Sequence, residues 1–216
     1  MVEVKACLFD LDGVIVDTAK YHFIAWRELA SELGFEFTEE HNEKLKGVSR
    51  MTSLEILLGV GGITLPEEKK IELATRKNER YVSYIMKMTP DEILPGVVDF
   101  LEQLKVKGIK TAIGSASKNA TVILERLELM SRFDVIIDGN RVSKAKPDPE
   151  VFLKGAGALG VPPAECVVFE DAAAGIEAAI NGGMKCVGIG QPEVLGKANR
   201  VIPGFQNFTV EELLQL

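Results

Sequence analysis

Short apolar stretches alternate with helix-like patterns along most of the 216-residue chain. Apolar runs bounded by turn residues predict buried β-strands at residues 6–9, 110–113, 135–137, 166–169 and 185–189. Apolar positions at helical spacing predict helices between them, at residues 97–107, 119–128, 149–159 and 172–181. This alternation predicts an α/β, Rossmann-like core, in which a parallel sheet is flanked by helices on both faces.

Residues 18–89 interrupt this alternation, because they carry no strand pattern. Apolar residues recur there at helical spacing, namely Phe23, Trp26, Ala30 and Leu33, and Gly34 ends that predicted helix. Further helices are predicted at residues 38–46, 50–58 and 66–86, with a glycine-rich break at residues 59–62. We therefore expect a small all-helical cap domain at residues 18–89, inserted into a core domain that consists of residues 1–17 and 90–216.

The charge balance narrows the class of partner. Acidic residues outnumber basic ones, 32 to 25, and the formal net charge is −7. Net negative charge argues against nucleic acid as the main partner, because a phosphate backbone requires a basic surface. A small anionic substrate stays compatible with this composition, since local charge decides its binding.

The sequence also carries expectations about location and thiol chemistry. No stretch approaches the roughly 20 apolar residues of a membrane span, and the short apolar start runs into two aspartates, unlike a signal peptide. Cys7, Cys166 and Cys186 lie in or beside predicted strands, which indicates reduced, buried thiols. We expect a cytoplasmic monomer with neither a membrane nor a nucleic-acid partner.

Two carboxylates follow the first predicted strand. Asp10 and Asp12 stand two residues apart, and Gly13 predicts the turn that ends the strand. In open α/β sheets the loops after the strands form the functional site. If the chain stays extended, both carboxylates lie on one side, where one could attack an electrophile while the other moves a proton.

Three further clusters lie where a predicted strand meets a predicted helix. They are residues 115–119, Lys146 within residues 144–149, and the acidic pair Glu170 and Asp171. Each has an ordinary structural explanation, since Asp148, Ser117 or Asn119 could cap a helix and most lysines are solvated. Capping does not readily explain four such clusters at the same kind of junction.

Together the four clusters suit metal-assisted phosphoryl transfer. Hydroxyl and amide groups at a helix N-terminus bind phosphate, and a lysine offsets its charge. Three carboxylates at two strand ends would hold a divalent cation, and Mg²⁺ prefers oxygen ligands. The free carboxylate could then attack phosphorus and form an aspartyl-phosphate.

In this order the clusters resemble the haloacid dehalogenase superfamily. Its motifs, Asp-x-Asp-x-(Val/Thr), a Ser or Thr after a strand, a lysine and an acidic pair, are matched by residues 10–14, Ser115, Lys146, and Glu170 with Asp171. The helical insert resembles the small helical cap of that family. Ala172 departs from the pattern, because some relatives carry serine there. We expect a small effect, since the acidic pair is intact.

Segments in the predicted cap make the resemblance closer. The chain is similar to the β-phosphoglucomutase branch of the superfamily at residues 9–18, 21–23 with Trp26, 45–50, 76–78, 115–119, 170–171 and 174–176. This resemblance implies a Mg²⁺-dependent enzyme that interconverts β-D-glucose 1-phosphate and D-glucose 6-phosphate. The implied intermediates are an aspartyl-phosphate and β-glucose 1,6-bisphosphate, and the implied partner is a small-molecule sugar phosphate.

The resemblance also implies a role for each matching residue of the core. Asp10 would be the nucleophile that becomes phosphorylated, and Asp12 the general acid and base. Asp10, the backbone carbonyl of Asp12, and Asp171 would hold Mg²⁺, with Glu170 in or near its coordination shell. The residues implied to cradle the transferred phosphate are Ser115, Ala116 and Lys146.

A second set of residues would bind the rest of the bisphosphate. Those implied for its second phosphate are Arg50, Ser117, Lys118 and Asn119. Arg50 suits this role, because a planar guanidinium binds phosphate bidentately. Those implied to face the sugar are Lys46, Gly47, Val48 and Ser49, and the substrate-binding set also includes Trp26. His22 and Lys77 would link cap closure to the placement of Asp12, although His22 also fits an ordinary surface histidine.

Other functions stay open at this point. A sugar-phosphate phosphatase on the same scaffold would need the same four clusters, so only the cap residues and residues 118–119 favour a mutase. A non-catalytic binding protein has no chemical reason to keep every carboxylate and the lysine. A dehalogenase is poorly supported, because the acidic pair and Asp12 serve no purpose in metal-free chemistry.

Overall fold

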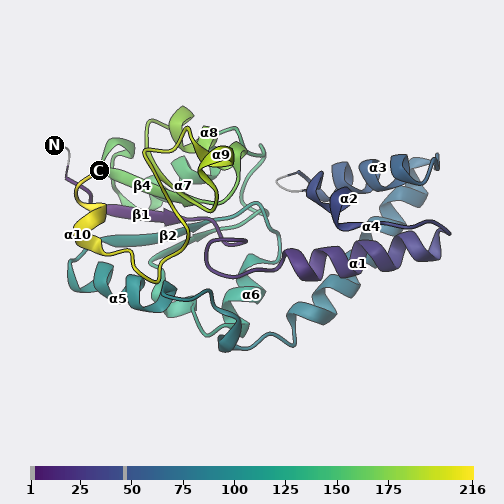
Figure 1. The fold of residues 1–216 in the computed structure, drawn as a ribbon, viewed down its shortest axis with the longest axis horizontal. Helices are drawn as coiled ribbons and strands as arrows, with labels where there is room; N and C mark the ends of the chain where they lie inside the picture. The colour runs from purple at the N-terminus through teal and green to yellow at the C-terminus, as the bar shows by residue number, and fades with distance from the viewer. Residues whose placement is uncertain (1–2, 46–47) are drawn as a thin grey trace. The chain divides into compact units, whose positions relative to one another are not determined.

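The computed structural model describes residues 3–45 and 48–216 (Figure 1). Its strands are β1 (Ala6–Phe9), β2 (Lys110–Gly114), β3 (Val135–Ile137), β4 (Cys166–Glu170), β5 (Lys185–Ile189) and β6 (Arg200–Ile202). Its α-helices are α1 (Ala19–Glu32), α2 (Glu39–Glu43), α3 (Arg50–Val60), α4 (Glu67–Ile85), α5 (Val97–Val106), α6 (Ala120–Arg126), α7 (Glu150–Leu159), α8 (Ala173–Asn181), α9 (Pro192–Leu195) and α10 (Val210–Leu213). Short 3₁₀ helices are η1 (Pro90–Glu92), η2 (Met130–Arg132) and η3 (Pro163–Glu165).

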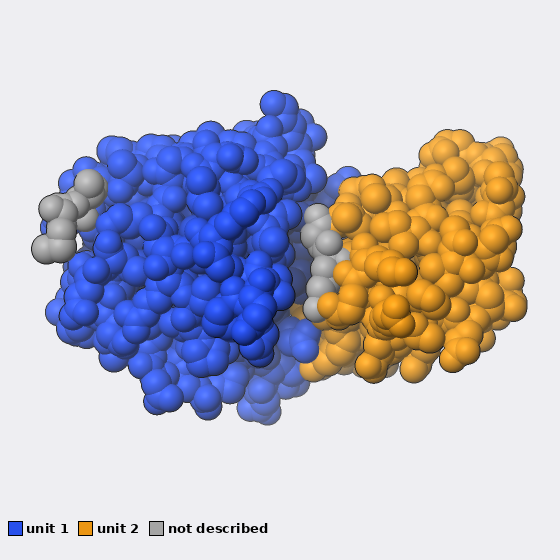
Figure 2. Space-filling model, turned by 45° about the horizontal axis from the view of Figure 1, so that its top comes forward, with its two compact units in different colours: residues 1–17, 89–216 blue, residues 18–88 orange. Residues whose placement is uncertain are grey.

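The chain forms two compact units, which Figure 2 shows in different colours. Residues 1–17 with 89–216 form the first unit, which we name the core unit, and residues 18–88 form the second, the cap unit. The boundary places Thr89 in the core unit, one residue from the predicted boundary. That the two units are separate folding domains stays a prediction.

The described strands of the core unit form a fully parallel sheet in the order β3-β2-β1-β4-β5-β6. Helices α7 and α8 cover one face of this sheet, and α5 covers the other (Figure 1). The predicted α/β fold is therefore confirmed. The pattern missed β6, because Arg200 leaves only two consecutive apolar residues in this three-residue strand.

Strand β1 lies between β2 and β4 in the middle of the sheet. All four of its side chains are buried, because helices cover both faces of a parallel sheet. On one face Leu8 packs in a cluster with Phe152 of α7. On the other, the ring of Phe9 stacks on that of Phe169 from β4, with centroids 4.8 Å apart. Asp10 therefore follows a strand that is packed on both faces.

The cap unit has its own apolar core. Trp26 and Leu29 of α1, Leu54 of α3 and Leu73 of α4 are buried in it. Buried side chains recur three or four positions apart along α1 and α3, as Trp26 and Leu29 do, which is the spacing that places them on one face. Helix α4 packs against both α1 and α3.

Two predicted helix ends in this unit are wrong. Helix α3 continues past residue 58 to Val60, because Gly59 is exposed and a single glycine is tolerated there. Helix α2 is shorter than the predicted span 38–46: it begins after a capping box between Thr38 and His41 and ends at Glu43. Lys46, at the end of that predicted span, lies outside the described residues.

Two smaller expectations concern thiols and membrane spans. Cys7, Cys166 and Cys186 are buried and unpaired, as predicted. Burial raises the pKa of the Cys7 thiol well above its usual value, so this thiol stays protonated near neutral pH.

Within residues 3–45 and 48–216, no helix is both long and apolar enough to cross a membrane.

The packing of β1 yields a test of the core. Phe9→Ala should lower the free energy of unfolding by about 3–5 kcal/mol, the usual cost of deleting a buried aromatic side chain. The rings that would lose their contact are Phe100, Phe133, Phe169 and Phe205. Urea denaturation followed by circular dichroism measures the change. Val106→Ala, at an exposed position of α5, is the control and should cost less than about 0.5 kcal/mol. Equal effects would contradict the packing described.

Candidate functional site

Carboxylates from two neighbouring strands meet at the carboxyl edge of the sheet. Strands β1 and β4 pair in parallel with Phe9 opposite Phe169, so Asp10 and Glu170 follow in register. Oxygen atoms of Asp10, Glu170 and Asp171 lie within 4.8 Å of one another, and we name these three residues the acidic cluster. Asp10 and Glu170 are buried, whereas Asp171 is half-buried.

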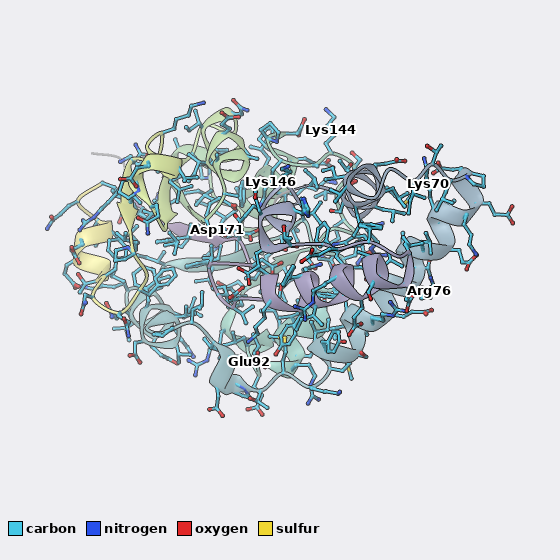
Figure 3. All side chains as sticks on the ribbon, turned by 45° about the vertical axis from the view of Figure 1, so that its right-hand side comes forward. Lys70, Arg76, Glu92, Lys144, Lys146 and Asp171 are labelled. Atoms are coloured by element: carbon cyan, nitrogen blue, oxygen red, sulfur yellow. The ribbon has the colours of Figure 1, made fainter. Side chains whose placement is uncertain are left out.

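Lys146 connects two members of the acidic cluster. Its Nζ donates hydrogen bonds to Asp10 Oδ1 at 2.6 Å and to Glu170 Oε2 at 2.9 Å. The lysine precedes α7, its side chain is only 8% exposed, and its ammonium lies over the ring of Phe152. Lys146 and Asp171 are labelled in Figure 3. The alternative interpretation of Lys146 as an ordinary solvated lysine is therefore wrong.

Burial and charge shift the titration of these groups. Burial alone would lower the pKa of Lys146, but Asp10 and Glu170 outweigh it and raise that pKa, so the ammonium stays charged. Burial raises the pKa of Glu170, and the neighbouring carboxylates add to the rise while Lys146 opposes it. Burial also raises the pKa of Asp12 well above its usual value, and the charges of Asp10 and Asp171 add to this.

The donor set suits a hard divalent cation. Carboxylate oxygens are the ligands that Mg²⁺ and Mn²⁺ accept in proteins. The acidic cluster has three carboxyl groups, and the single ammonium of Lys146 contacts two of them, so a bound cation would compensate the remaining negative charge. Asp12 lies outside the acidic cluster. The predicted metal contact through its backbone carbonyl therefore stays a prediction.

The chain turns sharply between Asp12 and Val16. Gly13 has φ +76°, which a residue with a side chain rarely adopts, and its N–H donates to Val16 O at 2.8 Å. Asp12 itself forms an isolated bridge with Val16. The predicted turn at Gly13 is confirmed. It holds Asp12 close enough to Asp10 for the charge of Asp10 to contribute to the raised pKa of Asp12.

The segment 115–119 lies next to the acidic cluster along the sheet edge, because β2 pairs with β1. Ser115 Oγ accepts a hydrogen bond from Ser117 N at 3.1 Å, and Ser117 Oγ accepts one from Asn119 N at 3.2 Å. The sequence left open that Ser117 or Asn119 caps a helix: Asn119 is the N-cap residue of α6 but makes no side-chain capping bond, and the two hydroxyls bond within the preceding turn. The role of the segment in phosphate binding stays a prediction.

A loop that the sequence did not single out supports this segment. Asn140 Nδ2 donates to Lys118 O at 3.0 Å, and Gly139 N donates to Ser117 O at 3.0 Å. Both residues follow β3, so their proximity to residues 115–119 depends on the pairing of β2 with β3. No local pattern could have identified them.

Two other core residues keep structural roles. Asp148 Oδ1 accepts a hydrogen bond from Glu150 N at 3.0 Å at the start of α7, although the N-cap residue of this helix is Pro149 and not Asp148 as predicted. Ala172 donates its backbone N–H to Glu170 Oε1 at 3.2 Å. That bond needs no hydroxyl, so the absence of serine at this position leaves it in place.

In the cap unit, a second lysine is buried in a different environment. Lys77 is 2% exposed, and its Nζ lies 2.7 Å from His22 Nδ1. The same ammonium lies 4.4 Å from the ring centroid of Trp26 and 5.0 Å from that of Tyr81. Tyr81, which the sequence did not single out, also stacks on His22. Its position one helical turn after Lys77 was the available signal.

Burial and two cations lower the pKa of His22. Burial has the largest effect, and the charges of Lys77 and Arg50 add to it. The imidazole is therefore neutral near pH 7, and its Nδ1 accepts the hydrogen bond that the Lys77 ammonium donates. His22 is thus part of a defined pair in the cap unit, unlike an ordinary surface histidine.

Arg50 begins α3 and has an uncharged partner. Its Nη2 donates to Asn78 Oδ1 at 2.7 Å. An amide partner leaves the guanidinium charge uncompensated by that contact. The preceding residue, Ser49, accepts a hydrogen bond from Thr52 N and caps the helix, while Val48 is exposed. Lys46 and Gly47, both predicted to face the sugar, lie outside the described residues.

Comparisons with known proteins add to this geometry. The haloacid dehalogenase-like hydrolase family matches residues 4–183. The chain is 44% identical to a beta-phosphoglucomutase of Bacillus subtilis (strain 168), over 97% of this chain and 93% of that protein. It is 35% identical to a phosphorylated carbohydrates phosphatase of Thermotoga maritima, over 84% of this chain and 82% of that protein. The crystal structure of a beta-phosphoglucomutase from Clostridium difficile is similar with a TM-score of 0.92 and 42% identity, covering 98% of this chain and 96% of that one. The predicted resemblance is confirmed.

The lowered pKa of His22 predicts a pH dependence of cap stability. Because the imidazole binds a proton less readily in the folded state, stability is full above about pH 6.5 and falls below it, by about 1.4 kcal/mol for each pH unit until the folded pKa is reached. Fluorescence of Trp26, the single tryptophan of the chain, follows urea unfolding of this unit. His22→Phe should weaken the dependence, whereas His41→Gln should retain it. An unchanged dependence in His22→Phe would rule out His22 as its source.

Proposed function

We propose that this protein, which belongs to the haloacid dehalogenase-like hydrolase family, acts as a β-phosphoglucomutase. It would interconvert β-D-glucose 1-phosphate and D-glucose 6-phosphate through an aspartyl-phosphate on Asp10 and β-glucose 1,6-bisphosphate. The observation that carries this proposal is Asp10 held by Lys146 within the acidic cluster, in a chain similar to a known mutase over nearly its whole length.

Asp10 is the proposed nucleophile. Its Oδ1 accepts a hydrogen bond from Lys146 Nζ, and this ammonium would later contact the phosphoryl oxygens. Ser115 and Ala116, at the same sheet edge, would complete the cradle for the transferred phosphate. Mg²⁺ held by Asp10, the Asp12 carbonyl and Asp171, with Glu170 in or near its shell, would supply charge compensation.

Asp12 is the proposed general acid and base. In the first half-reaction the phosphoryl group passes from Asp10 to the sugar 6-hydroxyl oxygen, and Asp12 accepts the hydroxyl proton. In the second, Asp10 attacks the 1-phosphoryl group of the bisphosphate, and Asp12 returns the proton to the departing sugar O1. The raised pKa of Asp12 supports this role, because the residue must keep the proton between the two steps.

A mutase needs a second phosphate site, since both ends of the bisphosphate must be bound in turn. We propose that this site consists of Arg50, Ser117, Lys118 and Asn119. The uncharged partner of Arg50 supports its part, because the guanidinium charge is kept for an anion. The residues proposed to bind the sugar or order the cap unit are His22, Trp26, Lys46, Gly47, Val48, Ser49 and Lys77.

A sugar-phosphate phosphatase is the second candidate. The similarity to the phosphatase of Thermotoga maritima favours it, because hydrolysis would need the same acidic cluster and lysine. The two functions differ in what accepts the phosphoryl group from Asp10: a sugar hydroxyl in a mutase and water in a phosphatase. A cytoplasmic location and a monomeric state stay predictions.

One assay separates the two functions. The protein is mixed with β-glucose 1-phosphate, Mg²⁺ and a trace of glucose 1,6-bisphosphate, and glucose 6-phosphate and free phosphate are measured in the same tube. We expect glucose 6-phosphate to form with little free phosphate. Free phosphate without glucose 6-phosphate would overturn the mutase and support the phosphatase.

Arg50→Ala tests the second phosphate site. We expect the rate of isomerisation at low bisphosphate to fall about 10- to 150-fold, the loss of one or more charge-assisted hydrogen bonds. Release of phosphate from a small phosphate ester should change less than about threefold, because that ester does not reach a second site. Arg27→Ala removes the same charge from an exposed position of α1 and should leave both rates unchanged. Equal losses of both activities in Arg50→Ala would contradict the two-site scheme.

A further inference from the structure

We propose that Gly13 and Gly175 are positioning residues of the acidic cluster: their missing side chains leave the space that the carboxylates of Asp171 and Glu170 occupy. The inference deepens the proposed function and rests on its metal site. It assigns the two glycines an effect on metal affinity, separate from their effect on the backbone.

Gly13 lies against Asp171. A Cβ added at Gly13 would stand 2.1 Å from Asp171 Oδ2 and 2.5 Å from Asp171 Cγ. Carbon and oxygen atoms that are not bonded do not approach so closely, so one of the two groups would have to move. The Asp171 carboxylate is the end of a half-buried side chain, whereas Gly13 is held in the tight turn after Asp12. The carboxylate is therefore the group that yields.

Gly175 lies against Glu170. A Cβ at this position would stand 2.0 Å from Glu170 Cδ and 2.3 Å from Glu170 Oε1. Gly175 is inside α8, and its φ lies outside the positive range that disfavours side chains. Alanine is a better helix former than glycine. The backbone conformation therefore does not require glycine at position 175, whereas the position of the Glu170 carboxylate does.

A displaced Glu170 would disturb more than its own position. Its Oε1 accepts from Ala172 N, and its Oε2 accepts from Lys146 Nζ. The same ammonium binds Asp10. A shift of this carboxylate would therefore loosen Lys146 and change the charge balance around the proposed nucleophile. Groups that orient metal ligands commonly affect metal affinity about 10- to 100-fold.

The other described glycines meet different obstacles or none. A Cβ at Gly96 or Gly139 would meet backbone atoms, and one at Gly155 would meet Leu8. Among the glycines that the structure describes, only Gly13 and Gly175 would place a Cβ against a carboxylate. The coincidence of both with members of the acidic cluster is what the inference explains.

The chain offers a matched control for each glycine. Gly183 has φ +73°, close to the +76° of Gly13, and a Cβ there would meet nothing within 4 Å. Gly157 lies inside α7, as Gly175 lies inside α8, and its added Cβ would also meet nothing within 4 Å. Gly183→Ala therefore reproduces the backbone strain of Gly13→Ala without the carboxylate, and Gly157→Ala reproduces the helical context of Gly175→Ala.

The experiment measures Mn²⁺ binding directly, by the electron paramagnetic resonance signal of free Mn²⁺ during titration of the full chain. Gly13→Ala and Gly175→Ala should weaken Mn²⁺ affinity by about 10- to 100-fold. The Mn²⁺ affinity of Gly183→Ala and Gly157→Ala should stay within about twofold of that of the parent protein, because substitutions away from the acidic cluster do not displace its carboxylates. Circular dichroism and urea unfolding without metal establish that each variant is folded.

Each outcome decides the inference. Loss of affinity in Gly13→Ala and Gly175→Ala, with the controls unchanged, supports it, and if only one of the two variants folds, that variant decides. Parent-like affinity in a folded Gly175→Ala overturns it, as does an equal loss in the controls. Failure of both variants to fold would assign the glycines to the packing of the core and also overturn it. A parent protein that binds no Mn²⁺ would overturn the proposed metal site as well, so the two failures are distinguishable.

Discussion

The ammonium of Lys146 lies between Asp10 and Glu170, and the arrangement of the site depends on this contact. The parallel pairing of β1 with β4 places two buried carboxylates next to each other, whose mutual repulsion and loss of hydration disfavour folding. Lys146 offsets both costs, and its position before α7 follows from the packing of that helix on the sheet. Asp171 adds a third carboxylate to the two that Lys146 contacts, and a divalent cation would compensate the surplus of negative charge.

The cap unit buries its own lysine in a chemically different way. Lys77 is surrounded by the rings of Trp26 and Tyr81 and by a neutral His22. Aromatic faces attract a cation without carrying a charge of their own. In the cap unit burial and the charge of Lys77 disfavour protonation of His22. In the core unit the carboxylates of Asp10 and Glu170 keep Lys146 charged. Two lysines of equal intrinsic chemistry thus have different effects, because the groups packed around them differ.

The distinction between a mutase and a phosphatase is a question of phosphate acceptors. In the proposed chemistry the acidic cluster and Lys146 would serve the formation and cleavage of an aspartyl-phosphate in either case. A mutase must also bind the second phosphate of the bisphosphate while the first is transferred. Arg50 is suited to this because Asn78 orients its guanidinium without neutralising it. A carboxylate in place of that amide would have compensated the charge that a phosphate needs.

Local pattern by itself determined the strands with long apolar runs, the helix-rich insert, and the order of the chemical clusters from Asp10 to Asp171. This was possible because a strand that is buried on both faces is a continuous apolar run, and because turns favour particular residue types. It missed β6, in which Arg200 leaves a run of only two apolar residues, and it placed the end of α3 too early, before Gly59. Only the tertiary structure decided that Lys146 reaches Asp10 across 136 residues of sequence, that Tyr81 packs on His22, and that Gly13 and Gly175 lie against carboxylates. These contacts depend on strand register and on helix packing between distant segments. The sequence around each of these residues contains no signal for either of the two.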